Sequence, residues 1–260
     1  MSFRPRLIAL DVDGTIVDES NVVPPAIGDA IRAATQAGIA VVLATGRSFV
    51  SARTILDQLD LPPTEHVLSN GAVIGRYPPA TVVDMLTFDA RPVVAQLRRE
   101  LPKARFAVEA NGRGYLVTAP FPEGELHGSV QVASLEQMIA HPVPRVVVRD
   151  LDATEADFEA LTARMDLTGV SHHVGYTAWL DLAPPGVDKA HGLRRLVGRL
   201  GISSAEVLAL GDGRNDAAML GWAGRGVAIA GAPPEVIAAA DAVTGSVADA
   251  GAAVEIRRWI

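Results

Sequence analysis

The chain has 260 residues, which is enough for one large domain or two smaller ones with a substantial core. Hydrophobic residues make up 49% and charged residues 20%, and the 23 basic and 30 acidic residues leave a net charge of −7. This acidic balance argues against a nucleic-acid partner, because nucleic acids are normally bound by a basic face. The absence of cysteine excludes disulfides, thiolate catalysis and cysteine-bound zinc.

The sequence has neither a membrane-span pattern nor a secretory-signal pattern. The apolar stretch after the basic N-terminus, Leu7 to Leu10, is interrupted by Asp11 and is too short for the hydrophobic part of a signal peptide. No uncharged apolar run approaches the ~20 residues that a membrane helix needs. We therefore expect a soluble, cytoplasmic protein with no membrane partner.

The first third of the chain alternates between short apolar runs and amphipathic stretches. Residues 7–10 and 39–44 are continuously apolar, as buried parallel strands are. Helices are expected after Pro24-Pro25 and around residues 52–59, because their apolar residues recur at helical spacing. A third strand is expected to end at residues 67–68. Strand, helix, strand, helix, strand at this spacing predicts parallel βαβ units.

The pattern changes after about residue 80, where Pro78-Pro79 interrupts the chain. Short strands and helices now follow one another without the parallel βαβ spacing, and Ser134 to Gln137 has the capping-box pattern that opens a helix. The expected strands are 82–86, 106–108, 115–117, 145–149, 170–174 and 178–182, and the expected helices are 93–101, the one after Ser134, and 154–165. Residues 111–114 are expected to join two paired strands. We predict an α+β module of roughly a hundred residues, a normal size for a small domain.

The parallel pattern returns after Pro184-Pro185-Gly186. A helix is expected around residues 193–200, strands at 207–210 and 226–229, and a short helix after Pro233-Pro234. The predicted fold class is α/β, a doubly wound parallel-sheet (Rossmann-like) core interrupted by an inserted α+β module.

A pair of carboxylates follows the first strand, in Asp11-Val12-Asp13-Gly14-Thr15. One residue separates the two acids, so the turn can direct both into one crevice, and Gly14 permits the tight backbone needed there. An ordinary turn capped by Asp13 or Thr15 is the alternative. At ordinary residue frequencies such a tetrad arises by chance with a probability on the order of 0.003 in a chain of this size. We therefore favour a functional role.

Two further strands end in polar segments. Thr45-Gly46-Arg47 follows the second strand, although by itself it is typical of a helix start. Residues 211–216, Gly-Asp-Gly-Arg-Asn-Asp, follow the strand at 207–210, and their carboxylate and amide oxygens suit magnesium. Because ligands bind beyond the carboxyl ends of parallel strands, we expect these segments to meet Asp11 at one edge of the sheet. Lys189, at the start of a helix, can add a positive charge there.

Five motifs, in their order and spacing, resemble the haloacid dehalogenase-like hydrolases, specifically the Cof-type sugar-phosphatase branch. They are Asp11-Val-Asp13-Gly-Thr15, Thr45-Gly-Arg47, Ser69-Asn70-Gly71-Ala72, Gly186-Val-Asp188-Lys189 and Gly211-Asp212-Gly213-Arg214-Asn215-Asp216. The motifs extend over nearly the whole chain. The resemblance implies a hydrolase core domain of residues 1–81 and 184–260, with a cap domain of residues 82–183 over the active site.

The residues and the resemblance indicate a phosphatase that acts on small phosphorylated metabolites, with sugar phosphates as the expected substrates. Asp11 is expected to attack phosphorus and form an aspartyl phosphate. Asp13 is expected to protonate the leaving oxygen and later to take a proton from water. The expected Mg²⁺ ligands are Asp11, the backbone carbonyl of Asp13, and Asp212.

The other motif residues are expected to hold the phosphoryl group or to support the site. The expected substrate-binding residues are Thr45, Gly46, Asn70, Lys189 and Asn215, and the expected supporting residues are Thr15, Arg47 and Asp216. Asp216 would orient Lys189 or a metal-bound water. For Asn70, contact with substrate and a purely structural role are equally favoured. We expect a monomer or a small homo-oligomer.

The inserted module contains several polar or aromatic residues with two possible roles. The neighbouring His172 and His173 point to opposite faces of a strand, so we expect ordinary cap residues rather than a metal site. Arg145 and Arg149 share one strand face, and we favour a solvated face over a grip on a substrate anion. For Trp179, packing at the domain junction is favoured over stacking on a ligand.

Two alternative functions stay open. A phosphosugar mutase on the same fold would use Asp11 to move phosphate between positions of a sugar, and phosphate release without a sugar bisphosphate activator would distinguish the two enzymes. A non-catalytic switch, phosphorylated on Asp11, is disfavoured because it needs neither Asp13 as an acid nor an insert of this size.

Overall fold

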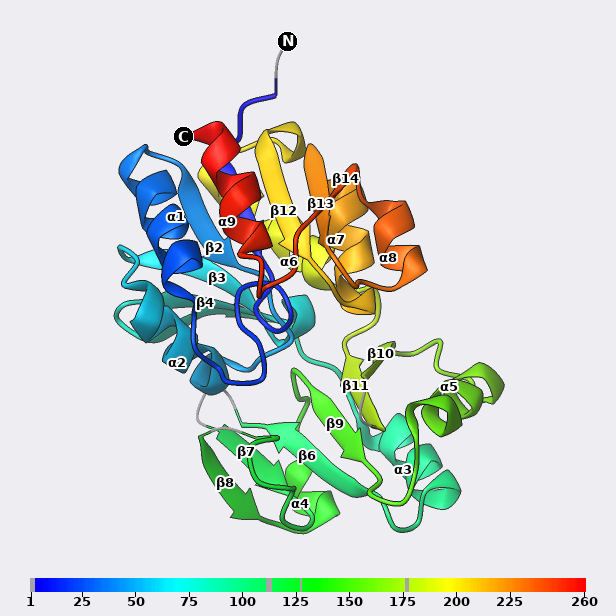
Figure 1. The fold of residues 1–260 in the computed structure, drawn as a ribbon. Coiled ribbons are helices and arrows are strands. Elements are labelled where there is room, and N and C mark those ends of the chain that lie inside the picture. Colours follow the sequence, from blue (N-terminus) through cyan, green and yellow to red (C-terminus); the bar gives the residue numbers. More distant parts are fainter. Residues whose placement is uncertain (1–2, 111–113, 127, 176–177) are drawn as a thin grey trace.

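The computed structural model describes residues 3–110, 114–126, 128–175 and 178–260. These residues form a larger part, built around a parallel sheet and containing both ends of the described chain, and a smaller part with a separate sheet (Figure 1). The smaller part is inserted between β5 (Thr81–Met85) and α6 (Lys189–Leu200). Within the described residues, no helix combines the length and the apolar character needed to cross a bilayer.

The core sheet has five parallel strands in the order β14-β13-β12-β1-β2. Strand β1, between β12 and β2, is buried throughout because helices cover both faces of the sheet. The strands are β1 (Leu7–Leu10), β2 (Ala40–Leu43), β12 (Val207–Gly211), β13 (Arg225–Ile229) and β14 (Ala242–Thr244).

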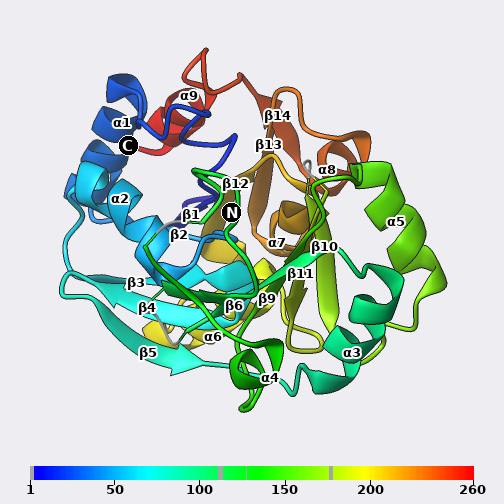
Figure 2. The same cartoon turned by 90° about the horizontal axis from the view of Figure 1, so that it is seen from below.

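Two groups of helices make the sheet doubly wound (Figure 2). On one face pack α1 (Pro25–Gln36), α2 (Phe49–Leu59) and α9 (Gly251–Ile256), and on the other pack α6, α7 (Ala217–Trp222) and α8 (Pro234–Ala239). The predicted α/β fold class, with a doubly wound core and an inserted α+β module, is therefore confirmed. Short 3₁₀ segments lie at η1 (Ser69–Gly71), η2 (Ser204–Glu206), η3 (Arg214–Asp216) and η4 (Arg257–Trp259).

The third strand of the predicted βαβ series departs from the expectation. β3 (Thr64–Leu68) is joined to the end of β2 by an isolated parallel bridge between Ala44 and Val67, and its ladder is formed antiparallel with β4 (Val73–Tyr77). β4 pairs in turn with β5, so that a small antiparallel sheet extends the core. The predicted start of the cap, residue 82, lies inside β5. The exact domain bounds, 1–81 with 184–260 and 82–183, stay a prediction.

The inserted part has a six-stranded sheet in the order β10-β11-β9-β6-β7-β8, antiparallel except for β7 and β8. Its strands are β6 (Arg105–Glu109), β7 (Gly114–Val117), β8 (Ser129–Val132), β9 (Val146–Arg149), β10 (Ser171–Gly175) and β11 (Trp179–Ala183), and its helices are α3 (Arg91–Glu100), α4 (Leu135–Met138) and α5 (Glu155–Arg164). The capping box predicted at Ser134 is present, with Gln137 as its partner. The predicted connection at 111–114 lies mostly outside the described residues.

The strand at residues 145–149 is more deeply buried than its alternating sequence predicts. Val146 and Val148 pack under the helices of the inserted part, whereas Val147 packs on the opposite face of the sheet. Arg145 shares that second face, and only 6% of its surface is exposed. The expectation of a half-exposed strand with a solvated arginine face is therefore wrong, because other residues of the inserted part, such as Phe121 and Leu126 against Val147 and Glu125 against Arg149, cover this face.

Candidate active site

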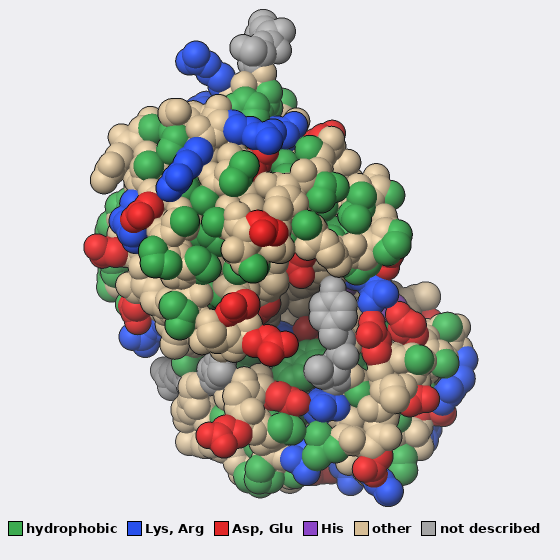
Figure 3. All heavy atoms as spheres, viewed as in Figure 1, with side chains coloured by type: hydrophobic (Ala, Val, Ile, Leu, Met, Phe, Trp, Pro, Cys, Tyr) green, Lys and Arg blue, Asp and Glu red, His purple; other side chains and the backbone are tan. Residues whose placement is uncertain are grey.

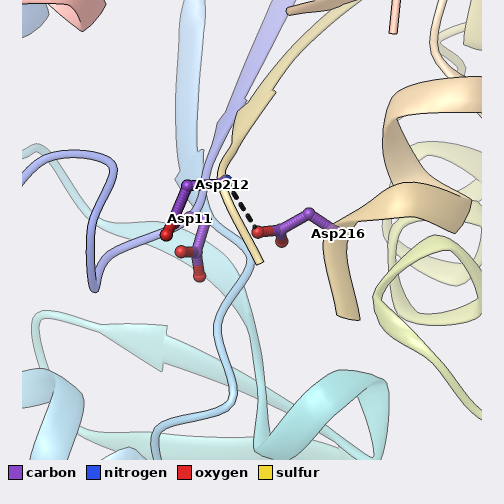
Figure 4. Close-up of side chains that lie close together, drawn as sticks. All are labelled: Asp11, Asp212 and Asp216. Atoms are coloured by element: carbon purple, nitrogen blue, oxygen red, sulfur yellow. Dashed lines mark hydrogen bonds between the residues drawn. The ribbon is translucent and has the colours of Figure 1, made fainter. Parts of the chain in front are cut away.

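Three core strands end at one edge of the sheet and bring acidic side chains together there. Leu10 at the end of β1 is paired with Leu43 of β2 and with Leu210 of β12, so Asp11 and Asp212 leave the sheet side by side. Asp216 comes from η3, and Figure 4 shows its carboxylate directed toward the other two. One oxygen from each of the three lies within 4.8 Å of the others. The edge predicted from sequence is where the acids meet.

A buried lysine neutralises part of this cluster. The Nζ atom of Lys189 lies 2.5 Å from Oδ1 of Asp11 and 2.6 Å from Oδ1 of Asp216, and its side chain is 1% exposed. Lys189 is the first residue of α6, where Asp188 caps the helix by accepting a hydrogen bond from the backbone N–H of His191. The strong cap fixes the helix end and thereby the lysine.

The remaining hydrogen bonds tie the acids to the backbone and to Thr15. Oδ2 of Asp216 accepts hydrogen bonds from the backbone N–H groups of Asp212, at 3.0 Å, and Gly213, at 2.8 Å. The Thr15 hydroxyl donates to Asp212 at 3.0 Å. Both Thr15 and Asp216 therefore contact the acidic cluster, and their supporting roles stay a prediction.

The electrostatics leave an excess of negative charge at this point. Burial, followed by the proximity of Asp216, raises the pKa of Asp11 well above its ordinary range. The same two causes raise the pKa of Asp212 to about 6. Burial would lower the pKa of Lys189, but Asp11 and Asp216 outweigh it and raise that pKa. Because one ammonium faces three carboxylates, the cluster favours an additional cation, and its all-oxygen donors fit Mg²⁺.

Gly14 has a specific steric reason to be glycine. Its backbone has a φ of +78°, and a Cβ atom there would lie 2.2 Å from Oδ2 of Asp212. A side chain would therefore push Asp212 away from Asp11. The tight backbone predicted after β1 is present, and the close approach of a second strand end is what requires it.

Asp13 lies apart from the acidic cluster. Its carboxylate is 62% exposed and is bound by Arg47, whose Nη2 lies 2.5 Å from Oδ1 and whose Nε donates to Oδ2 at 3.0 Å. Asp11 and Asp13 nevertheless line the same cavity. The expected single crevice for both acids is present, although only the Asp11 carboxylate joins the acidic cluster.

The predicted phosphoryl-binding residues fall into two groups. Gly46 and Asn215 line the cavity. Thr45 is fully buried, and its hydroxyl accepts a hydrogen bond from the backbone N–H of Arg47 at 3.0 Å. Asn70 is also buried: its Oδ1 accepts from Asn215 at 2.9 Å, and its Nδ2 donates to Asp181 at 3.4 Å. The side chains of Thr45 and Asn70 thus support the wall of the site.

A cavity of about 350 Å³ lies between the core and the inserted part, where Figure 3 shows the surface hollowed. Residues from both parts line it. From the core these include Asp11, Asp13, Gly46, Arg47, Asp212 and Asn215, and from the inserted part they include Tyr115, Glu125, Arg145, His173, Trp179 and Asp181. A substrate phosphate at Asp11 would therefore direct its organic part toward the inserted sheet.

The polar wall on the side of the inserted part was not predicted from the sequence. Nε of Arg145 donates to Asp181 at 2.7 Å, and its Nη1 donates to the Tyr115 hydroxyl at 3.4 Å. Ser69 of the core donates to the buried Glu109 at 2.5 Å. The alternation of Trp179 and Asp181 on one face of β11 was a signal for this wall, because the intervening residue Leu180 faces the apolar core.

Trp179 and the two neighbouring histidines of the inserted part differ in whether they reach the cavity. Trp179 lines the cavity and also packs edge-on against Phe121, with ring centroids 6.1 Å apart. His173 lines the cavity, whereas its neighbour His172 is exposed. The two neighbouring side chains therefore lie on opposite faces of β10, as the strand geometry predicts.

Comparisons with known proteins agree with this geometry. The family of haloacid dehalogenase-like hydrolases matches residues 8–256. A phosphoglycolate phosphatase of Natronomonas pharaonis is 30% identical, with 91% of this chain and 90% of that protein covered. The HMP-PP phosphatase of Cronobacter sakazakii is 28% identical, with 90% and 87% covered. The solved structure of BT1666 from Bacteroides thetaiotaomicron, a phosphatase of the haloalkanoate (HAD) superfamily, has a TM-score of 0.81 at 26% identity, covering 98% of this chain and 95% of that one. The chain therefore belongs to the haloacid dehalogenase-like hydrolases, in their Cof-type branch, and it is an enzyme of the phosphatase class.

Proposed function

We propose that this enzyme is a Mg²⁺-dependent phosphatase that hydrolyses small phosphorylated metabolites, sugar phosphates among them, through an aspartyl phosphate on Asp11. The observation that carries the proposal is the contact of Asp11 with Lys189, beside Asp212 and Asp216, at the cavity between the core and the inserted part. A carboxylate can approach an anionic phosphate ester only where other groups offset the repulsion, and this cluster is suited to do so.

The first chemical step transfers the phosphoryl group to the enzyme. An Asp11 carboxylate oxygen attacks phosphorus while the bond between phosphorus and the ester oxygen breaks. Asp13 gives its proton to the leaving oxygen, which departs as an alcohol. Lys189 stays beside Asp11 and holds it in place for attack. Gly46 and Asn215, which line the cavity, are available to hydrogen-bond the phosphoryl oxygens.

The second step returns the enzyme to its starting state. Asp13, now a carboxylate, accepts a proton from water as the water oxygen attacks phosphorus, and the bond to Asp11 breaks to release inorganic phosphate. Asp11, Asp212 and the backbone carbonyl of Asp13 would hold Mg²⁺, with Asp216 close by. The bound ion supplies positive charge that stabilises the transferring phosphoryl group.

The size of the cavity supports a small substrate. About 350 Å³ lies at the lower end of ordinary ligand sites, and it is shared between the phosphate and the organic part. The relatives named above act, by their names, on phosphoglycolate and on HMP-PP. The oligomeric state and the cytoplasmic location expected from the sequence stay predictions.

The test is phosphate release by purified protein from a panel of phosphorylated metabolites. We expect release with Mg²⁺, none in EDTA, and recovery when Mg²⁺ is restored. Asp212→Asn is expected to raise the Mg²⁺ concentration needed for half-maximal activity by at least about tenfold. Asp166→Asn, which changes an exposed acid of the inserted part, is the matched control. Full activity in EDTA would exclude the metal from the reaction, and release that depends on a sugar bisphosphate would indicate the mutase instead.

A further inference from the structure

Arg47 contacts both the exposed carboxylate of Asp13 and the loop that precedes α1. The guanidinium is 9% exposed, whereas Asp13 is 62% exposed. Besides its two bonds to Asp13, Arg47 donates through Nη2 to Oδ1 of Asn21. Among the described residues, its Nη1 atom has no hydrogen-bond partner although it is buried. The orientation of the guanidinium plane therefore depends on Asp13 and Asn21.

Asn21 is held in place by the neighbouring helix α2. The Nε2 of Gln58 donates to the backbone carbonyl of Asn21 at 3.0 Å, and the backbone N–H of Val23 donates to Oε1 of Gln58 at 2.9 Å. One glutamine side chain thus bridges two points of the loop. Asn21 itself has a φ of +57°, a left-handed conformation that asparagine, aspartate and glycine tolerate better than other residues.

We propose that Asn21 and Gln58 are positioning residues for Asp13 that act through Arg47. The inference rests on the proposed function, in which Asp13 transfers a proton to the leaving oxygen. An exposed aspartate would otherwise sample several rotamers, and proton transfer needs its oxygen within hydrogen-bond reach of the ester. The bidentate bond from Arg47 fixes the carboxyl plane, and Asn21 fixes Arg47.

Substitutions of Asn21 can distinguish the positioning role from a purely structural one. Glycine accommodates the φ of +57° but has no side-chain acceptor, so Asn21→Gly removes the bond to Arg47 without backbone strain. Asn21→Asp keeps an oxygen at the same place and accepts from Arg47. Gln58→Glu keeps the acceptor for Val23 but removes the donor to Asn21. Asp60→Gly relieves another left-handed residue, at the end of α2, without touching Arg47 and is the control.

The first readout compares p-nitrophenyl phosphate with phenyl phosphate, which have similar shapes but differ in how much they need protonation of the leaving oxygen. We expect Asn21→Gly to lower kcat/KM for phenyl phosphate about tenfold more than for p-nitrophenyl phosphate. Gln58→Glu is expected to show a smaller difference of the same sign. Asn21→Asp is expected to restore the wild-type ratio within about twofold, and Asp60→Gly to leave it unchanged. Equal losses on both esters in Asn21→Gly would overturn the inference.

The second readout does not depend on turnover. An NMR spectrum of the Arg47 Nε–H group, assigned with Arg47→Lys, is expected to show a slowly exchanging signal in the wild type and in Asn21→Asp, and fast exchange in Asn21→Gly. An unchanged signal in Asn21→Gly would contradict the positioning role. If the wild type hydrolyses neither aryl ester, this spectrum alone decides whether Asn21 holds Arg47. The proposed function itself fails only if the wild type also releases no phosphate from the metabolite panel with Mg²⁺.

Discussion

At the scale of single residues, the site depends on a buried imbalance of charge. The buried Lys189 contacts the buried carboxylates of Asp11 and Asp216. Because one ammonium group makes both contacts, a change of either aspartate alters the environment of the other. Removing one partner of a buried ion pair typically costs about 3–5 kcal/mol, because the other charge is left uncompensated. In the proposed function this cluster receives a cation and an anionic substrate, which would offset the unfavourable charge of the free protein.

Asp11→Asn is expected to lower steady-state phosphate release to less than about 10⁻³ of the wild type, because an amide of the same shape is no nucleophile. The fold should persist, since the substituted amide still occupies the same space and offers Lys189 an acceptor oxygen. Phosphate release and circular dichroism on the same preparation check the two parts. Activity of the variant that co-purifies with the protein, rather than with a contaminant, would exclude Asp11 as the nucleophile.

Glu109 gives a pH-dependent prediction. Burial raises its pKa above the ordinary value of 4.5, although the hydrogen bond from Ser69 and the charge of Arg145 act in the opposite direction. A carboxyl group whose pKa is raised in the folded state contributes stability below pH 4.5 that is lost as the pH rises through its folded value. Glu109→Gln stays neutral, so its stability relative to the wild type should increase with pH above about 4.5. Urea unfolding at about pH 4.5 and about pH 8 measures this, and an unchanged difference between the two pH values would refute it.

At the scale of elements, the turn η1 of the core contacts the inserted part. Ser69, Asn70 and Gly71 all have positive φ angles, of 51°, 51° and 96°. Such conformations cost about 1–3 kcal/mol for each residue other than glycine and persist where surrounding contacts hold them. Here the contacts reach Glu109 and Asp181 of the inserted part. The strained turn therefore places two side chains against the opposite domain.

Gly71→Ala is expected to destabilise the protein by about 2–4 kcal/mol and to reduce activity. A Cβ at this position would lie 2.0 Å from the carbonyl oxygen of Asp188, the residue that caps α6 beside Lys189. Gly38→Ala is the matched control, because Gly38 also has a positive φ, +83°, but no atom lies within 4 Å of its added Cβ. That control should lose only about 1–2 kcal/mol. Chemical denaturation measures the free energy of unfolding of both variants. Equal losses of stability would show that the contact with Asp188 is unimportant.

At the scale of the whole molecule, the inserted part closes the cavity from the side opposite the acidic cluster. Besides the contacts of η1, Arg214 of the core donates to Glu155 at the start of α5 and to Glu235 of α8, both at 2.6 Å. These exposed pairs are individually weak and leave room for opening and closing. In the proposed function, we expect the inserted part to move away from the core for substrate entry and product release.

Replacing residues 87–183 by a short linker is expected to flatten the preference among phosphate esters and to lower kcat/KM steeply for the best substrate. The replacement keeps β5, because this strand pairs with β4 of the core. In the proposed mechanism the core residues around Asp11 carry out phosphoryl transfer, whereas the replacement removes Arg145, Trp179 and Asp181 together. Activity of the wild type and the truncated protein on the same panel is compared, after circular dichroism has shown that the truncated protein folds. A truncated protein with the full-length order of preference would place specificity in the core.

The sequence by itself determined the parts of this protein that follow from local patterns. Apolar strands followed directly by Asp11, Thr45 and Asp212 predicted both the parallel sheet and the meeting of these residues, because the carboxyl ends of parallel strands share one edge. Helix positions followed from apolar spacing and from caps such as Ser134. The short elements α7, β14 and α9 near the C-terminus were not predicted, because six or fewer residues show too little periodicity. The equally short α8 was predicted only because Pro233-Pro234 marks its start.

Only the tertiary structure decided the contacts between segments far apart in the chain. Arg145 and Asp181 are 36 residues apart, and Arg47 and Asp13 are 34 apart, so no local pattern links either pair. The same reason explains why the arginine face of β9 is buried. β3 and β4, by contrast, are neighbours in the chain and pair across the short turn η1. Burial of a strand face depends on which surface another domain covers, and the alternation of side chains along one strand cannot specify that surface.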